Sequence, residues 1–111
     1  MATHQIREIK QLIDAGEYEI AAKEIDLLLA SCKGSESHLK ILKGLCFKAL
    51  NEWHSMEQAF VEAMLEGALT PKLFLEVALA QVKQQKFVQL GETIRDAKIL
   101  FPPELLGTTR S

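Results

Sequence analysis

The chain has 111 residues, of which 48% are hydrophobic and 25% are charged, and its formal net charge is −2. This composition is typical of a single folded domain and excludes a disordered chain. Acidic and basic residues are interspersed without a basic stripe, so nucleic acid is not an expected partner. No apolar signal segment opens the sequence, and no apolar run approaches the ~20 residues that span a bilayer. With only Cys32 and Cys46, neither a disulfide framework nor a zinc site is indicated, so we expect a cytoplasmic protein without membrane insertion.

The first half of the chain predicts three helices. Apolar residues at helical spacing predict the first over residues 4–15, and Gly16 ends that pattern. A second periodic stretch begins near Tyr18 and fades over residues 31–35. The third is expected over residues 37–50, and Asn51 follows it.

The second half predicts three more helices. Ser55 and Gln58 resemble a capping box, which would open the fourth helix, and that helix is expected to end near Gly67. Thr70-Pro71 is a strong start signal for the fifth, because a hydroxyl N-cap is followed by a proline at the first helical position. The fifth helix is expected to end near residue 85. The sixth is expected over residues 87–100 and is closed by Pro102-Pro103. No segment alternates as a half-buried strand does, so the fold class is all-α.

Three of the predicted turns share one pattern, in which a small or polar residue precedes a polar residue and an aromatic residue. They are Gly16-Glu17-Tyr18, Asn51-Glu52-Trp53 and Gln85-Lys86-Phe87. The aromatic residues are 35 and 34 residues apart. Seven residues after each aromatic residue stand Ile25, Phe60 and Ile94, on one face of the second helix of each pair. We therefore interpret the chain as three helix-turn-helix units, and we expect each aromatic residue to wedge between the helices of its unit.

A helical hairpin with a period near 34 resembles the tetratricopeptide repeat. The third unit matches best, with Phe74, Val77, Ala78, Phe87, Ile94, Ala97 and Pro102. The second keeps Gly44, Phe47, Trp53, Phe60 and Ala63, and the first keeps mainly Leu12, Gly16, Tyr18 and Ala21. The resemblance covers residues 2–103 and implies six antiparallel helices in a short right-handed superhelical array. The units would span approximately residues 2–35, 37–70 and 71–103 of one domain (residues 1–103), followed by a short C-terminal tail at residues 104–111. A plain six-helix bundle is the alternative.

No constellation of residues for catalysis or metal binding is found. His4, His38 and His54 have no partner at metal-ligand spacing, and Cys46 lies on an apolar helix face, where it is interpreted as a small hydrophobic residue. Phosphate-binding and nucleophile motifs are also missing. We therefore expect no enzyme, no metal and no cofactor.

In arrays that resemble tetratricopeptide proteins, the first helix of each unit lines a concave groove. Transferred to this sequence, the groove positions are Ile6, Lys10, Ile13, His38, Ile41, Leu45, Lys48, Lys72, Leu75, Leu79 and Val82. The centre would be apolar, with lysines at the rim, and would suit the apolar face of an amphipathic helix. The alternative is that these side chains pack on one another. Residues 73–82 are apolar nearly all round, which predicts a helix buried on every side.

The sequence also lacks a polar capping helix after the third unit, so a partner, a second copy or the tail is expected to cover the sixth helix. The leading hypothesis is a small chaperone or adaptor that binds an amphipathic helix, in a hetero-complex or a homodimer. Arrays of this size are similar to the bacterial type III secretion chaperones that hold a needle subunit in the cytosol. A self-associating scaffold is the second hypothesis, and a small enzyme or ligand carrier is the third.

Overall fold

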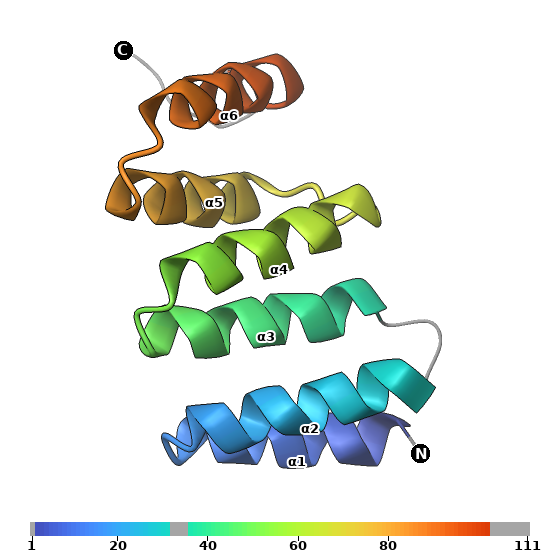
Figure 1. Cartoon of the computed structure of the whole chain (residues 1–111). Helices are drawn as coiled ribbons and strands as arrows, with labels where there is room; N and C mark the ends of the chain where they lie inside the picture. Colours follow the sequence, from blue (N-terminus) through green and yellow to red (C-terminus); the bar gives the residue numbers. More distant parts are fainter. Residues whose placement is uncertain (1, 32–35, 103–111) are drawn as a thin grey trace.

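Six α-helices, stacked one above another, make up the part of the chain that the structure describes (Figure 1). The computed structural model describes residues 2–31 and 36–102, with backbone only for residues 2–4. Cys32, Pro103 and the tail at residues 104–111, which the sequence interpretation included, lie outside the described residues. The helices are α1 (Ala2–Asp14), α2 (Tyr18–Ser31), α3 (Glu36–Ala49), α4 (Trp53–Leu65), α5 (Pro71–Lys83) and α6 (Phe87–Leu100). The predicted all-α chain of three helical hairpins is confirmed.

The stack is elongated, with extents of 45 × 27 × 23 Å. Each helix packs mainly against the helix before it and the helix after it in the chain. Such neighbour-to-neighbour packing is characteristic of repeat architectures, in which one unit buries the apolar face of the next. None of the described helices is long and apolar enough to cross a lipid bilayer.

The three repeated turns have the same backbone conformation. Gly16, Asn51 and Gln85 adopt positive φ angles of 83°, 60° and 61°. In each turn the next residue donates its amide hydrogen to a carbonyl five residues earlier, over 2.9 Å: Glu17 to Leu12, Glu52 to Phe47, and Lys86 to Gln81. This pattern is the Schellman motif, which satisfies the last carbonyls of a helix through one residue in the left-handed region. The sequence repeat is therefore also a repeat of backbone geometry.

The same turns set where the second helix of each unit begins. The predicted capping box at Ser55 and Gln58 is wrong, because α4 already begins at Trp53 and its N-cap residue, Glu52, makes no side-chain cap. The turn at Asn51 holds Glu52 close to α3, so the new helix begins at once without a hydroxyl cap. The start signal at Thr70-Pro71 is confirmed, since Thr70 Oγ1 accepts a hydrogen bond from the Leu73 amide at 3.2 Å.

Two apolar clusters form the core, and α3 lies between them. The first cluster joins α1, α2 and α3 and is centred on Ile9, Ala21, Ile25, Leu28, Leu39, Leu42 and Cys46. The second joins α4 and α5 and contains Met56, Phe60, Ala63, Leu73, Val77 and Ala80. Leu45 on α3 packs against both clusters. Cys46 is fully buried, which confirms its interpretation as a small hydrophobic residue.

Close approach of α3 and α4 depends on Gly44. A Cβ atom at this position would lie 2.6 Å from Cε1 of Phe60, whose side chain is fully buried. Gly91 on α6 is the opposite case, since a Cβ atom there would meet nothing within 4 Å.

We expect Gly44→Ala to lower the free energy of unfolding by about 1–2 kcal/mol, because the clash with a buried ring outweighs the gain in helix propensity. Gly91→Ala is the matched control and should raise it by about 0.5–1 kcal/mol, since only the propensity term acts. Urea denaturation followed by circular dichroism measures both. If both substitutions changed the free energy of unfolding in the same direction, the close packing at Gly44 would be contradicted.

Candidate functional site

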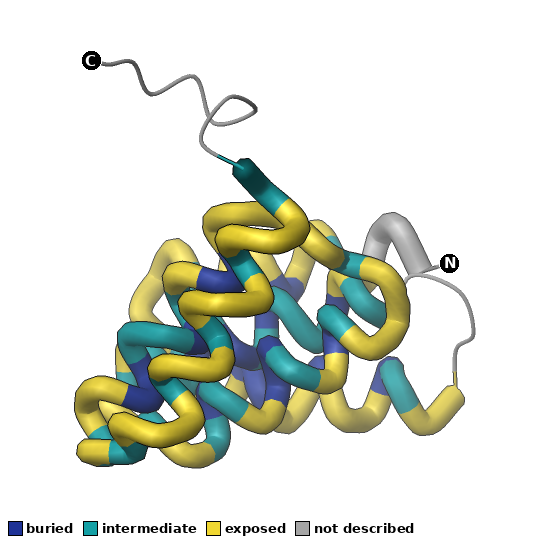
Figure 2. Tube along the Cα trace, turned by 90° about the horizontal axis from the view of Figure 1, so that it is seen from above, coloured by how far each residue is buried: buried dark blue, intermediate teal, exposed yellow. Residues whose placement is uncertain are grey.

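The third hairpin, formed by α5 and α6, is covered differently from the other two. No residue of α6 is buried, and exposed residues dominate the view from the α6 end of the stack (Figure 2). The repeat position that carries Ile25 and Phe60 is fully buried in α2 and α4, but its counterpart on α6, Ile94, is 42% exposed. In the first two units this position belongs to an apolar cluster that includes residues of the following helix, and no described helix follows α6.

The aromatic residues after the turns show the same difference. Tyr18 packs against the first cluster and Trp53 against the second. The Lys83 ammonium group at the end of α5 lies 5.5 Å from the ring centroid of Trp53. The prediction that Phe87 would wedge between helices is wrong, because its side chain is 63% exposed. Each of these clusters includes residues of the following unit, and no such unit follows Phe87 among the described residues.

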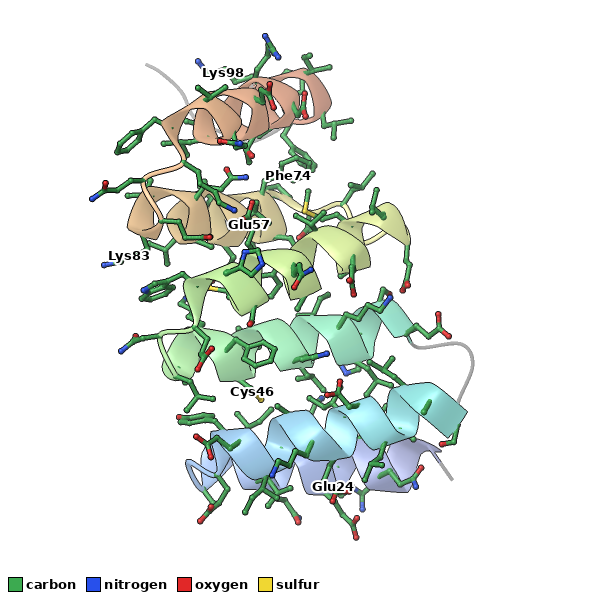
Figure 3. All side chains as sticks on the ribbon, in the orientation of Figure 1. Glu24, Cys46, Glu57, Phe74, Lys83 and Lys98 are labelled. Atoms are coloured by element: carbon green, nitrogen blue, oxygen red, sulfur yellow. The ribbon has the colours of Figure 1, made fainter. Side chains whose placement is uncertain are left out.

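An apolar groove lies between α5 and α6. We call it the α5–α6 groove; its volume is about 250 Å³, and it is lined by Pro71, Phe74, Leu75, Ala78, Thr93, Ile94, Ala97, Lys98 and Phe101. The rings of Phe74 and Phe101 meet edge to face, with centroids 5.6 Å apart. Phe74 and Lys98 are labelled in Figure 3. Lys98 is the one charged residue among the lining residues.

A larger hollow of about 680 Å³ lies between α1 and α2, but its walls are mixed. They include the polar side chains of Gln5, Gln11, Glu24 and Ser31 beside Ile20 and Leu27. Apolar ligand faces bind best where the walls are apolar and a few polar groups fix the orientation. The α5–α6 groove fits that description and the larger hollow does not.

The groove positions predicted from the sequence lie in three kinds of place. Ile6 and Ile13 pack against the first cluster, Ile41 and Leu79 pack against the second, and Leu45 packs against both, so these five are half-buried. The exposed positions are Lys10, His38, Lys72, Leu75 and Val82. Of the predicted set, only Leu75 lines the α5–α6 groove.

Leu75 and Val82 also correct the expectation for the fifth helix. Their side chains are 70% and 43% exposed, so α5 is not buried on every side. Leu73, Phe74, Val77 and Ala80 form its buried face.

The remaining predicted position, Lys48, takes part in an ion pair across the stack. Its Nζ atom lies 2.9 Å from Oε1 and 3.0 Å from Oε2 of Glu76 on α5. The Glu76 side chain is only 13% exposed. The sequence interpretation missed Glu76, which neutralises one lysine that was assigned to the rim of the predicted groove.

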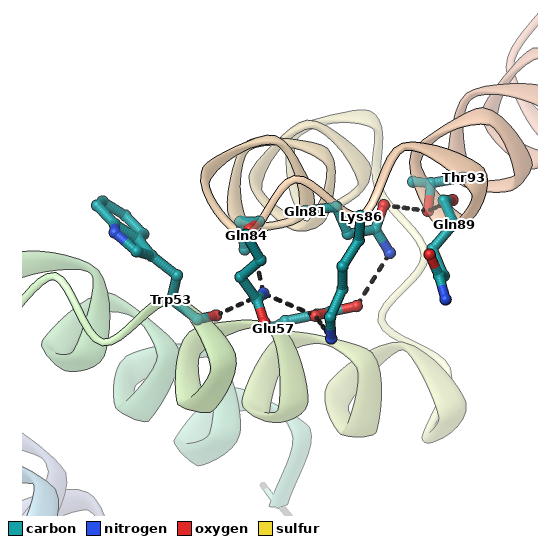
Figure 4. A network of polar contacts seen from close by, with 8 residues as sticks. Trp53, Glu57, Gln81, Gln84, Lys86, Gln89 and Thr93 are labelled. Atoms are coloured by element: carbon teal, nitrogen blue, oxygen red, sulfur yellow. Dashed lines mark hydrogen bonds and ion pairs between the residues drawn. The ribbon is translucent and has the colours of Figure 1, made fainter.

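A polar network holds α6 in place beside the groove (Figure 4). The Glu57 carboxylate on α4 accepts hydrogen bonds from Gln81 Nε2 at 3.0 Å, Gln84 Nε2 at 2.9 Å and Lys86 Nζ at 3.0 Å. Thr93 on α6 donates to Gln81 Oε1 at 2.7 Å. The network therefore connects α4, α5, the turn and α6.

The environment of Glu57 shifts the pKa of its carboxyl group. Burial acts to raise that pKa, but the hydrogen bonds from Gln81, Lys86 and Gln84 together outweigh burial and lower it. Glu57 is therefore charged at neutral pH, as the ion pair with Lys86 requires.

Elsewhere, two ionisable groups have shifted pKa values for structural reasons. A hydrogen bond to Glu66 raises the pKa of Lys40, which also lies near Glu62. Burial raises the pKa of the Cys46 thiol, which makes it a poor nucleophile. No group of His, Cys, Asp and Glu side chains suited to a metal ion occurs within the described residues.

Comparisons with protein-family models, with curated proteins and with solved structures gave no match to this chain.

Proposed function

We propose that this chain is a protein-interaction module in which the α5–α6 groove binds the apolar face of an amphipathic helix from a partner protein. The main support for this proposal is the position of the exposed apolar surface. Of the eleven large hydrophobic side chains exposed among the described residues, nine lie between residues 65 and 100: Leu65, Leu69, Leu75, Val82, Phe87, Val88, Ile94, Ile99 and Leu100. Apolar surface concentrated at one end of a molecule marks an interface, and Leu75 and Ile94 of this set line the α5–α6 groove.

The groove itself favours a helix as the ligand. Leu75 and Ile94 project from α5 and α6 with most or much of their surface exposed, and Phe74, Ala78 and Ala97 form the floor between them. Side chains at helical spacing on a partner would insert between these two rows, as in other helix-in-groove complexes. Lys98 at the edge would pair with an acidic residue at the border of the partner's apolar face.

Within this proposal the protein acts as a small chaperone or adaptor in the cytosol, without catalysis. The recurrence of one turn at intervals of 35 and 34 residues supports the tetratricopeptide-like interpretation of the array. A type III secretion chaperone for a needle subunit is the specific variant that the size and the apolar groove favour. Its ligand would be an aggregation-prone helix.

The test is binding of a synthetic amphipathic peptide of about 18 residues, with leucines on one face and glutamates on the other. Fluorescence anisotropy of the labelled peptide should give a dissociation constant on the order of 10 µM. Leu75→Asp and Ile94→Asp should each weaken binding at least about tenfold, because each places a charge in an apolar groove. Both residues are exposed enough for the variants to fold, which circular dichroism checks.

Leu27→Asp is the matched control, since Leu27 on α2 is 65% exposed and lies outside the groove. It should leave peptide binding unchanged. Equal binding by all three variants, or no binding by the wild type, would refute the assignment of the groove.

A further inference from the structure

The outward-facing side of α6 carries a row of four residues that the proposed groove does not use. Leu90, Thr93 and Ala97 are half-buried and mark the side of α6 that faces the stack. At 100° per residue, the opposite side of the helix carries Val88, Glu92, Arg95 and Ile99, which we call the outer stripe. Val88 and Ile99 are 75% and 69% exposed, and Ile99 also borders a hollow of about 420 Å³ beside α4 and α5. Glu92 and Arg95 are also exposed, and neither forms an ion pair with another described residue.

The outer stripe is complementary to itself. Its order is apolar, acidic, basic, apolar, and the four positions are symmetric about the midpoint between residues 93 and 94. When a second α6 is placed antiparallel across that midpoint, Val88 lies opposite Ile99 of the second copy. Glu92 then lies opposite Arg95 of the second copy, and each contact occurs twice because the arrangement has two-fold symmetry.

We propose that the outer stripe is a dimer interface, in which α6 packs antiparallel against α6 of a second copy of this chain. In this dimer Val88 of each copy covers Ile99 of the other, and Glu92 of each copy pairs with Arg95 of the other. The outer stripe shares no residue with the α5–α6 groove, so the dimer and the bound partner helix use different residues. The dimer can therefore be tested independently of the proposed function.

The size of the contact predicts its strength. A 14-residue helix is about 21 Å long, and one helix pair buries less than the ~1,200 Å² typical of stable complexes. The dimer is therefore weak, with a dissociation constant on the order of 100 µM, and its population depends on protein concentration.

Sedimentation of the full chain between about 10 µM and 1 mM tests the proposal, together with charge reversals. Glu92→Arg and Arg95→Glu should each weaken dimerisation roughly tenfold or more, because both symmetry-related pairs change from attraction to repulsion. The double variant E92R/R95E restores both pairs and should dimerise as the wild type does. An equimolar mixture of the two single variants should form heterodimers, since each then supplies the charges that the other needs.

Glu24→Arg on α2 is the control for a change in net charge and should leave dimerisation unaltered. A wild-type chain that stays monomeric throughout the range overturns the proposal. The proposal is also overturned if both single variants dimerise like the wild type. The same holds if the mixture of the two single variants fails to associate. If dimers form only after removal of residues 103–111, the outer stripe belongs to that segment of the same chain instead.

Discussion

Replacing Phe60 with alanine is expected to lower the free energy of unfolding by about 3–5 kcal/mol, because it leaves a large cavity in the core. Phe60 is the largest of the fully buried side chains among the described residues, and it reaches from α4 to Gly44 on α3. Because Gly44 has no side chain to move into the space, the cavity cannot collapse easily. Urea denaturation gives the value directly.

The loss of stability caused by Phe60→Ala should also differ between the helices. Since each helix packs mainly on its neighbours, hydrogen exchange should show larger losses of protection in α4, α5 and α6 than in α1 and α2. Leu27→Ala, at an exposed site on α2, is the control and should change stability by no more than about 0.5 kcal/mol. A loss below about 1 kcal/mol for Phe60→Ala would mean that the ring does not lie between α3 and α4.

Glu57→Gln is expected to lower the free energy of unfolding by about 2–3 kcal/mol at pH 7. The amide loses the ion pair with Lys86 and brings its own NH₂ group toward the amide donors of Gln81 and Gln84. Gln81 is itself buried, so water does not readily replace the lost acceptor. Asp26→Asn is the matched control, because Asp26 pairs with Lys43 over 2.7 Å but its side chain is 57% exposed. That change should cost well under 1 kcal/mol.

The effect of Glu57→Gln should depend on pH. The folded-state pKa of Glu57 is lower than the unfolded value near 4.5, so its stabilisation is complete above that pH and is lost as the pH falls through the folded-state pKa. The difference in stability between wild type and variant should stay level from pH 7 to about pH 5 and shrink below about pH 4.5. A difference that persists unchanged to pH 3 would show that the charge of Glu57 is not the cause.

The local structure was largely predictable from the sequence because the residues that start and stop helices are clear. Gly16, Thr70-Pro71 and the three aromatic turns place the helices within a few residues of their observed bounds. The start of α4 was misplaced because a Schellman turn at Asn51, and not a hydroxyl cap, sets it. Asparagine and glutamine in left-handed conformations leave only a weak signal in a sequence, since glycine is the usual residue there.

The candidate site was less predictable, because it depends on what is absent beside α6 among the described residues. Ile94 and Phe87 occupy repeat positions whose counterparts in the first two units are covered, so the pattern predicts burial for them as well. Their exposure follows from the lack of a described helix after α6. Transfer of groove positions from first helices alone also missed Ile94, Ala97 and Phe101, which line the α5–α6 groove.

The recurring turn makes the length of this array adjustable. Residues 53–86 begin two residues after Asn51 and end one residue after Gln85, the left-handed residues of the second and third repeated turns, so a tandem copy of this stretch would join itself through a turn of the same geometry. Two helical layers at 8–10 Å each would extend the molecule by roughly 16–20 Å. The walls of the α5–α6 groove would keep their composition while moving outward with α6. The length of the array and the composition of its groove can thus be varied separately. A designer could lengthen the array without altering the groove.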